Sequence, residues 1–205
     1  MNRREHWEAV YRSRRPAEVS WYQAEAALSA RLIGAMTPER ESAIIDVGGG
    51  ASVLAGTLAR IGYTNLTVLD ISAAALAAAR SELAGGAGAI QWIEADVLTA
   101  ELPAAGFAFW HDRAVFHFLD SAADRSAYVA LAARAVAPGG HLLVATFAED
   151  GPSRCSGLDV IRYAPDALHA EFEPAFMAVE AHREAHRTPA GVTQSFTYCV
   201  CQRRG

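Results

Sequence analysis

Hydrophobic and polar residues alternate in blocks along the middle of the chain. Residues 44–47 are apolar except for Asp46, and they lead directly into three consecutive glycines at 48–50. From Ser52 onward the apolar residues recur at the three-to-four spacing of a helix, with Ser52 as its expected N-cap and Gly62 as the residue after its end. This block predicts a strand, a tight turn and a helix.

The succession of strands and helices continues toward the C-terminus. Further strands are predicted at residues 66–69, 89–94, 107–110 and 141–147, and further helices at 72–83, 124–136 and 165–172. Glycines 85–86 are expected to end the first of these helices. Residues 176–187 and 192–202 instead alternate apolar and polar positions around a turn, which predicts an antiparallel pair. We therefore expect a Rossmann-like, doubly wound α/β sheet, mostly parallel with a C-terminal antiparallel hairpin and with helices on both faces.

The first forty residues are predicted to be helical. One helix spans residues 2–15 and ends at Pro16, and a second spans residues 20–36. Four aromatic residues fall on these two segments: Trp7, Tyr11, Trp21 and Tyr22. The helical pair is expected to form a lid over the sheet, with Tyr11 and Trp21 lining a pocket, although aromatic residues at helical spacing also arise from plain packing.

Composition narrows the class of protein. The 205 residues are 52% hydrophobic and 20% charged, which suits one globular domain. No run approaches the length of a membrane span, and the first residues lack an apolar leader, so we expect a cytoplasmic protein. Three cysteines form an odd and small set, which fits a reducing compartment.

The charged residues exclude one kind of catalysis. The net charge is −5, and all 18 basic residues are arginine. Without lysine, Schiff-base catalysis by a lysine amine is excluded. Five arginines fall within the first fifteen residues, which indicates either a solvated helix face or a patch for an acidic partner.

The glycine turn indicates a nucleotide or nucleoside site. Glycines allow positive φ angles and a close approach of ligand to backbone, and the helix that follows presents unpaired N–H groups. Asp70 ends the second strand, where such folds place the acid that binds ribose hydroxyls. A dinucleotide fingerprint needs a third glycine, but Val53, Leu54 or Ala55 stands at that place in every register. Of the two cofactors that suit such a turn with an acid after the second strand, a dinucleotide such as NAD and S-adenosylmethionine, the pattern favours S-adenosylmethionine.

The motifs together resemble those of class I S-adenosylmethionine-dependent methyltransferases. They are Asp46-Val-Gly-Gly-Gly, Val68-Leu-Asp70, Glu94-Ala-Asp96-Val97, Trp110-His-Asp, Pro138-Gly-Gly and the terminal hairpin. The resemblance extends from about residue 5 to the end, because His6-Trp7, Tyr11 and Ser20-Trp21-Tyr22 resemble a compact bacterial-type branch of that family. It implies one domain, 1–205, with a lid at 1–40, a cofactor-binding core at 41–147 and a substrate-side segment with the hairpin at 148–205.

The same resemblance implies a set of residues that bind S-adenosylmethionine, which becomes S-adenosylhomocysteine when the methyl group leaves. These residues are Asp46, Gly48, Gly49 and Gly50 for the methionine and ribose portion, Asp70 and Ile71 for the ribose and the base edge, Asp96 and Val97 for adenine, His111 beside the sulfonium, and Tyr11 and Trp21 from the lid. One departure is Ser52, where many members have glycine.

Methyl transfer is an in-line displacement, so alignment of the reacting atoms is the main task of the protein. A general base is needed only if the nucleophile arrives protonated, and histidine is then favoured. The catalytic candidates are His111, Asp112 and His117. His117 lies between two phenylalanines, so it is alternatively a histidine satisfied within the core.

No metal is expected. The pair His182 and His186 lies in a segment that alternates like a strand, whereas the zinc motif needs a helix, so a solvated sheet face or substrate rim is predicted there. A three-thiolate site of Cys155, Cys199 and Cys201 is the less favoured alternative to core thiols.

The motifs leave the methyl acceptor open. Amino-directed nucleic-acid methyltransferases carry paired prolines with an aromatic residue after the fourth strand, where this chain has His111-Asp112-Arg113-Ala114. We expect a small-molecule substrate, with a protein side chain as the alternative, no nucleic acid or membrane partner, and a monomer or homodimer. A cofactor-binding protein without catalysis is the remaining possibility, because binding motifs alone do not establish turnover.

Overall fold

The computed structural model describes residues 2–83 and 90–205. The predicted helix end at glycines 85–86 and the predicted strand start at residue 89 therefore lie outside the described residues. Six α-helices are described: α1 Arg3–Ser13, α2 Ala27–Met36, α3 Leu54–Arg60, α4 Ala73–Glu82, α5 Ala122–Ala135 and α6 Pro165–Phe172. Two short 3₁₀ helices, η1 Pro16–Glu18 and η2 Phe116–Phe118, and a two-stranded hairpin, β6 Arg154–Cys155 with β7 Leu158–Asp159, complete the connections.

A single mixed sheet forms the centre of the fold. Its seven strands are β1 Ile44–Val47, β2 Leu66–Asp70, β3 Gln91–Glu94, β4 Phe107–Arg113, β5 Val136–Phe147, β8 Phe176–Arg187 and β9 Thr193–Arg203, in the order β3-β2-β1-β4-β5-β9-β8. The first five strands run parallel, β9 runs antiparallel to β5, and β8 runs antiparallel to β9. The predicted fold class is confirmed. Because β2 and β4 flank β1, the strand order reverses at β1, which is the point where open α/β sheets bind ligands.

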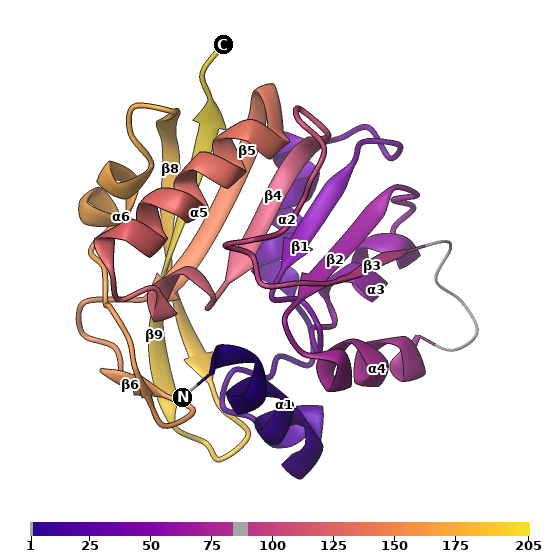
Figure 1. Cartoon of the computed structure of the whole chain (residues 1–205), viewed down its shortest axis with the longest axis vertical. Coiled ribbons are helices and arrows are strands. Elements are labelled where there is room, and N and C mark those ends of the chain that lie inside the picture. The colour runs from indigo at the N-terminus through magenta and orange to yellow at the C-terminus, as the bar shows by residue number, and fades with distance from the viewer. Residues whose placement is uncertain (1, 84–89) are drawn as a thin grey trace.

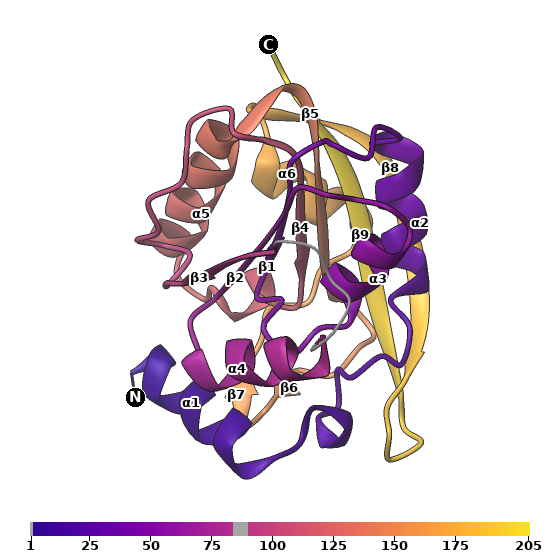
Figure 2. The same ribbon diagram turned by 90° about the vertical axis from the view of Figure 1, so that its right-hand side faces the viewer.

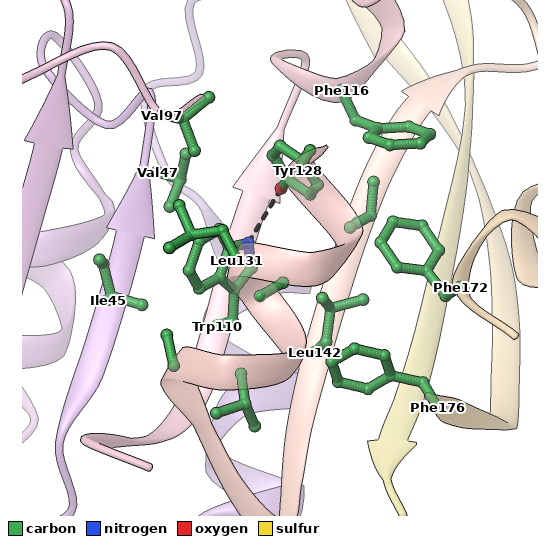
Figure 3. Close-up of a cluster of buried hydrophobic side chains, with 14 of the residues drawn as sticks. Ile45, Val47, Val97, Trp110, Phe116, Tyr128, Leu131, Leu142, Phe172 and Phe176 are labelled. Carbon is green, nitrogen blue, oxygen red and sulfur yellow. Dashed lines mark hydrogen bonds between the residues drawn. The ribbon is translucent and has the colours of Figure 1, made fainter. Parts of the chain in front are cut away.

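Helices cover both faces of the sheet (Figures 1 and 2). Helices α5 and α6 lie on one face, and α2 and α3 lie on the other. Each face of the sheet has its own hydrophobic core. Figure 3 shows the core under α5 and α6, where Trp110 of β4 packs against Tyr128 of α5 and donates a hydrogen bond from Nε1 to the Tyr128 hydroxyl oxygen at 2.9 Å. Neighbouring strand residues point to opposite faces, so Phe109 belongs to the other core, under α2 and α3.

Helices α1 and α4 lie together at the end of the sheet where the parallel strands finish (Figure 1). Glu8 of α1 accepts hydrogen bonds from the Ser72 hydroxyl at 3.1 Å and from the Ala74 N–H at 3.2 Å, at the first turn of α4. A carboxylate is stabilised at a helix N-terminus by the unpaired N–H groups and the helix dipole. This contact fixes the N-terminal helix at the carboxyl end of the parallel strands.

The second N-terminal helix is shorter than predicted. It begins at Ala27, not at Ser20, so the range 20–36 is corrected to Ala27–Met36. The backbone carbonyl of Ser20 accepts a hydrogen bond from His186 Nε2 at 2.8 Å, and that of Trp21 accepts one from Arg113 at 3.1 Å. These carbonyls bond to side chains of β8 and β4 and not to N–H groups of a helix, which holds the segment in an irregular conformation.

The fourth strand is longer than predicted, because it continues past Trp110 to Arg113. Its extension pairs with both neighbours, since Asp112 lies opposite Val47 and Arg113 lies opposite Ala145. Helix α3 begins later than predicted, with Val53 as its N-cap residue, while the Ser52 hydroxyl accepts from the Leu54 N–H at 3.0 Å.

Helix α5 spans Ala122–Ala135 where 124–136 was predicted, and β5 begins at Val136, five residues before the predicted start at His141. Several other predicted features agree with the structure. Ser72 caps α4, Gly62 has a positive φ after α3, helix α6 spans the predicted residues, and the terminal hairpin forms. Within the described residues, no helix is long and apolar enough to cross a membrane.

The buried polar group at Tyr128 gives a stability prediction. The Tyr128 hydroxyl donates to Asp112 Oδ2 at 2.5 Å and accepts from Trp110. Tyr128→Phe leaves the buried Trp110 N–H without its partner and removes one of the hydrogen bonds to Asp112, and we expect it to lower the free energy of unfolding by about 1–3 kcal/mol in urea denaturation. Tyr22→Phe, at a half-buried residue, is the matched control and should change stability little. Equal stability of the two variants would contradict the buried network.

Candidate active site

Two adjoining cavities open at the carboxyl ends of β1, β2 and β4. The first, which we call the aromatic cavity, encloses about 790 Å³ including its mouth, and Trp7, Tyr11, Trp21 and Phe118 are among its walls. The second, the glycine-turn cavity, encloses about 540 Å³ and lies against residues 46–49 and 51–54. Five residues line both cavities: Tyr11, Trp21, Val47, Gly48 and Arg113. The cavities therefore meet at the glycine turn under the N-terminal segment.

The glycines let two carboxylates lie against the turn. Gly48 has a φ of +69°, a conformation that favours glycine. A Cβ atom at Gly49 would collide with the Asp46 carboxylate, and one at Gly50 would lie 2.7 Å from Asp70 Oδ2. The sequence thus needs glycine at 49 and 50 because the acids of β1 and β2 occupy the space where a side chain would start.

Asp70 sits at the end of β2 and lines the aromatic cavity. Its Oδ2 accepts from the Gly50 N–H at 3.0 Å, and its Oδ1 accepts from the Ser72 N–H at 2.8 Å. Burial raises the pKa of the Asp70 carboxyl to about 6, although these N–H donors act in the opposite direction. The charge of Asp70 therefore changes near pH 6, closer to neutral pH than for an ordinary aspartate.

Asp46 belongs to a buried chain of hydrogen bonds with two other side chains. It lies opposite His111 in the β1–β4 register, and its Oδ1 is 2.7 Å from His111 Nδ1. The other ring nitrogen, Nε2, is 2.9 Å from the hydroxyl oxygen of Ser29 on α2. All three residues line the glycine-turn cavity, and Asp46 Oδ2 is buried without a partner among the described residues. That oxygen is available to accept a hydrogen bond from a bound molecule.

The three catalytic candidates do not come together. His111 and Asp112 are adjacent in β4 and point to opposite faces of the sheet. Asp112 is fully buried, accepts from the N–H groups of Val115 and Phe116 and from Tyr128, and lines neither cavity. Burial raises its pKa to about 6, against the effect of the Tyr128 hydrogen bond. The extension of β4 is the physical reason that the predicted cluster separates.

His117 is also inside the core. Its Nδ1 accepts from the Phe147 N–H at 3.3 Å, and its ring packs on Phe118 and Phe147. Burial, with a smaller effect of Arg113, lowers the pKa of His117 to about 3, and the ring lines neither cavity. This corresponds to the alternative interpretation of a core histidine, although Nε2 is buried without a partner among the described residues.

The predicted cofactor residues line the two cavities, with one exception. Asp70, Ile71, Asp96 and Val97 line the aromatic cavity, Asp46, Gly49 and His111 line the glycine-turn cavity, and Gly48, Tyr11 and Trp21 line both. Gly50 lines neither cavity and acts through its N–H bond to Asp70. Asp96 Oδ1 also accepts from the Leu98 N–H at 2.9 Å, which orients its carboxylate in the loop.

Arg113 and Ser29 are site residues that the sequence analysis did not predict, and Arg113 makes the larger set of contacts. Its Nε donates to the Tyr198 hydroxyl at 2.8 Å, and its terminal nitrogens donate to the Trp21 carbonyl at 3.1 Å and to Glu184 at 3.4 Å. Its guanidinium also lies 4.1 Å above the centre of the Phe196 ring. Arg113 thereby connects β4, the terminal hairpin and the segment that carries Trp21.

The polar face of β8 is only partly a solvated face, contrary to the prediction. Glu184 accepts from Gln23 and Tyr198, and His186 is buried against Ser20. Their side chains hold the N-terminal segment against the sheet. The alternation of the hairpin was the only sequence signal that pointed to these residues.

The three cysteines cannot form a common site. Cys199 and Cys201 belong to the core beneath α5 and α6, and Cys155 belongs to the core on the other face of the sheet. Within residues 2–83 and 90–205, no three His, Cys, Asp or Glu side chains group as metal ligands.

The comparisons with known proteins agree with this geometry. Residues 44–140 match the family model described as a methyltransferase domain. A protein of Mycobacterium tuberculosis described as an uncharacterized methyltransferase is 40% identical over 128 residues, which are 62% of this chain and 60% of that relative. The matched chain thus spans less than two thirds of the relative's length.

Solved structures share the fold at low sequence identity. The 1,6-didemethyltoxoflavin N1-methyltransferase of Burkholderia thailandensis, with its substrate and S-adenosylhomocysteine bound, superposes with a TM-score of 0.77 and 18% identity, covering 98% of this chain and 87% of that one. The [4+2]-cyclase SpnF superposes with a TM-score of 0.71 and 18% identity, covering 92% and 84%.

The seven-strand order and the cavities at its switch point define a domain of the class I methyltransferase fold. Residues 44–140 are similar in sequence to a methyltransferase domain, in agreement with the motifs that fall in that range.

The close contact between Gly50 and Asp70 predicts that a side chain at position 50 lowers the free energy of unfolding. The added Cβ of Gly50→Ala would also lie 2.6 Å from Ala75 Cβ, and we expect a loss of about 1–3 kcal/mol in urea denaturation. Gly34→Ala is the matched control, since its nearest atom is the Tyr63 hydroxyl at 4.0 Å, and it should stabilise α2 by roughly 0.5–1 kcal/mol. A Gly50→Ala variant as stable as the parent would mean that Asp70 is not fixed against the turn.

Proposed function

We propose that this chain is an S-adenosylmethionine-dependent methyltransferase that acts on a small molecule. The observation that carries the proposal is the pair of buried carboxylates, Asp46 and Asp70, at the ends of neighbouring strands and against one glycine turn. In this proposal residues 1–40 form the lid, residues 41–147 hold the cofactor, and residues 148–205 complete the acceptor side.

The residues present fit the cofactor. In this proposal Asp70 accepts from ribose hydroxyls, Asp96 accepts from the adenine amino group, and Ile71 and Val97 pack on the base; all four line the aromatic cavity. The unpartnered Asp46 Oδ2 in the glycine-turn cavity is placed to accept from an ammonium group of the methionine portion. When bound, S-adenosylmethionine supplies a methyl group on a positively charged sulfur.

The contribution of this chain to the reaction is alignment and exclusion of water. Helix α1 and the segment that carries Trp21 close over the junction of the two cavities, where they place Tyr11 and Trp21. Both ring nitrogens of His111 already have partners, and neither Asp112 nor His117 lines a cavity. The arrangement favours transfer to an acceptor that needs no base from the protein.

The covered site supports a small acceptor over a protein side chain. Arg3 and Arg4 pair with Asp124 and Glu94, so these two N-terminal arginines fasten the lid and are not free for an acidic partner. The methyltransferase of Burkholderia thailandensis acts on a small molecule within the same fold. The same fold occurs in a [4+2]-cyclase, so the fold alone does not establish methyl transfer. Cofactor binding without methyl transfer is therefore the second candidate.

Calorimetry with S-adenosylhomocysteine and NAD tests the cofactor. We expect binding of S-adenosylhomocysteine with a favourable affinity and no measurable heat with NAD, because the turn lacks the third glycine beside a pyrophosphate. A tight NAD complex would contradict the proposal. A screen of metabolite and protein pools for transfer of a labelled methyl group then separates catalysis from binding alone.

The pH dependence of that binding follows from Asp70. Its pKa is raised to about 6, so the empty site binds a proton below that pH and loses the charge that accepts from ribose hydroxyls. We expect the affinity for S-adenosylhomocysteine to fall by up to about tenfold per pH unit as the pH decreases from 6 to 5.

Asp70→Asn is the control for this dependence. At pH 8 it should weaken binding by about 1–3 kcal/mol, and its affinity should be nearly constant between pH 5 and 8 because the side chain has no charge to lose. An unchanged pH profile in Asp70→Asn would assign the titration to another group.

A further inference from the structure

We propose that the acceptor is an uncharged, flat aromatic or heteroaromatic molecule whose own nitrogen lone pair attacks the methyl group, and that it binds among Trp7, Trp21 and Phe118 with its edge at Arg113. This inference rests on the proposed function and names the substrate class of that same site.

The walls of the aromatic cavity are rings from three separate elements. Trp7 lies on α1, Trp21 on the segment before α2, and Phe118 on η2. The Trp7 ring meets Trp21 at 5.8 Å and Phe118 at 5.1 Å between ring centres, each nearly perpendicular. Each side chain is only half-buried, so ring surface remains open toward the cavity. Aromatic surfaces at right angles favour a thin, planar ligand that stacks on one ring and meets the edge of another.

The two arginines that line this cavity are both paired with carboxylates, so neither is free to bind a charged ligand. Arg113 is paired with Glu184, with its side chain 9% exposed, and Arg3 is paired with Asp124. Asp70 and Asp96 line the part of the cavity that the proposed function assigns to the ribose and the adenine. An anionic acceptor would be repelled by those carboxylates, and a cationic one by the positive sulfur of the bound cofactor, so an uncharged molecule fits the cavity best.

Arg113 supplies directional hydrogen bonding at the wall. A guanidinium has five N–H groups, and three of those of Arg113 bond to Tyr198, Trp21 and Glu184. The remaining two can donate to a ring nitrogen or a carbonyl oxygen at the edge of a ligand. The adjacent Ala114 has a φ of +73°, and this sharp exit from β4 leaves residues 113–115 together on the cavity wall.

The nucleophile must react without a base from the protein. Of the titratable groups that line this cavity, the carboxylates of Asp70 and Asp96 are assigned to the ribose and the adenine, which leaves Tyr11 and Cys155 near the acceptor. Burial raises the pKa of Tyr11 far above its usual range and that of Cys155 to about 12, so both side chains keep their protons. The histidines 111 and 117 do not line this cavity. A nitrogen whose lone pair is free at neutral pH satisfies this condition, whereas an alcohol or an ammonium group does not.

The methyl group passes from sulfur to nitrogen in a single displacement. The nitrogen lone pair forms the bond to the methyl carbon, the carbon–sulfur bond breaks, and its electron pair stays on sulfur. The positive charge moves from sulfur to the acceptor nitrogen, which releases a proton to water if it carries one.

Binding of three matched probes to the protein loaded with S-adenosylhomocysteine tests the inference. The probes are benzimidazole, which is uncharged near pH 7.5, indole-3-acetate, which is an anion, and tryptamine, which is a cation. We expect calorimetry to give at least roughly tenfold tighter binding for benzimidazole than for either charged probe, as unpaired charge is costly in a closed site.

Variants of two tryptophans locate the site. Trp7→Leu removes a cavity wall and should weaken benzimidazole binding by about tenfold or more, within the range known for stacking on aromatic side chains. Trp92→Leu, on the edge strand β3 and outside both cavities, should leave it unchanged. Urea denaturation of both variants is the control for folding, because Trp7 lines the same cavity as the residues assigned to the ribose and the adenine.

The outcomes separate this inference from the proposed function. If S-adenosylhomocysteine binds but the three probes bind equally or not detectably, the acceptor class is wrong and the proposed function stands. Equal effects of Trp7→Leu and Trp92→Leu would also overturn the acceptor site. Failure of S-adenosylhomocysteine itself to bind the parent protein overturns both.

Discussion

Burial of two carboxylates against one glycine turn is the constraint on which the site depends. Asp46 and Asp70 end neighbouring parallel strands, and the missing side chains at 49 and 50 make room for them. Burying Asp70 raises its pKa to about 6, a cost that backbone N–H groups reduce. A structure that keeps such a group ionised at neutral pH retains an acceptor directed into a cavity, and a ligand with hydroxyl or ammonium donors gains from it.

Strand β4 distributes its last residues between two environments because its side chains alternate. His111 and Arg113 face the side of α2 and the cavities, while Asp112 faces the core beneath α5. Arg113 then joins the hairpin to the segment that carries Trp21, so the acceptor wall and the antiparallel end of the sheet are held as one unit. Helix α1 is fastened separately, through Glu8 at the first turn of α4 and through ion pairs of Arg3 and Arg4.

Local patterns predicted the fold because strand periodicity, glycine turns and the hairpin are encoded within short stretches. Asp46, Asp70 and the glycines were predictable for the same reason. The segment 20–26 was mistaken for helix because its carbonyls are taken by His186 and Arg113, residues distant in the sequence. Ser29 and Arg113 were missed since their roles depend on register and on packing of α2, and the extension of β4 separated His111 from Asp112. Side-chain direction beyond a predicted strand end cannot be read from a local pattern.

The central claim is that the two carboxylates and the glycine turn hold S-adenosylmethionine at the junction of the two cavities. A crystal structure of the protein grown with S-adenosylhomocysteine measures this directly. The account predicts electron density with the ribose hydroxyls on Asp70, the adenine beside Asp96 and the methionine portion against Asp46. Density for the ligand elsewhere on the molecule, with Asp46 and Asp70 contacting only protein and water, would contradict it.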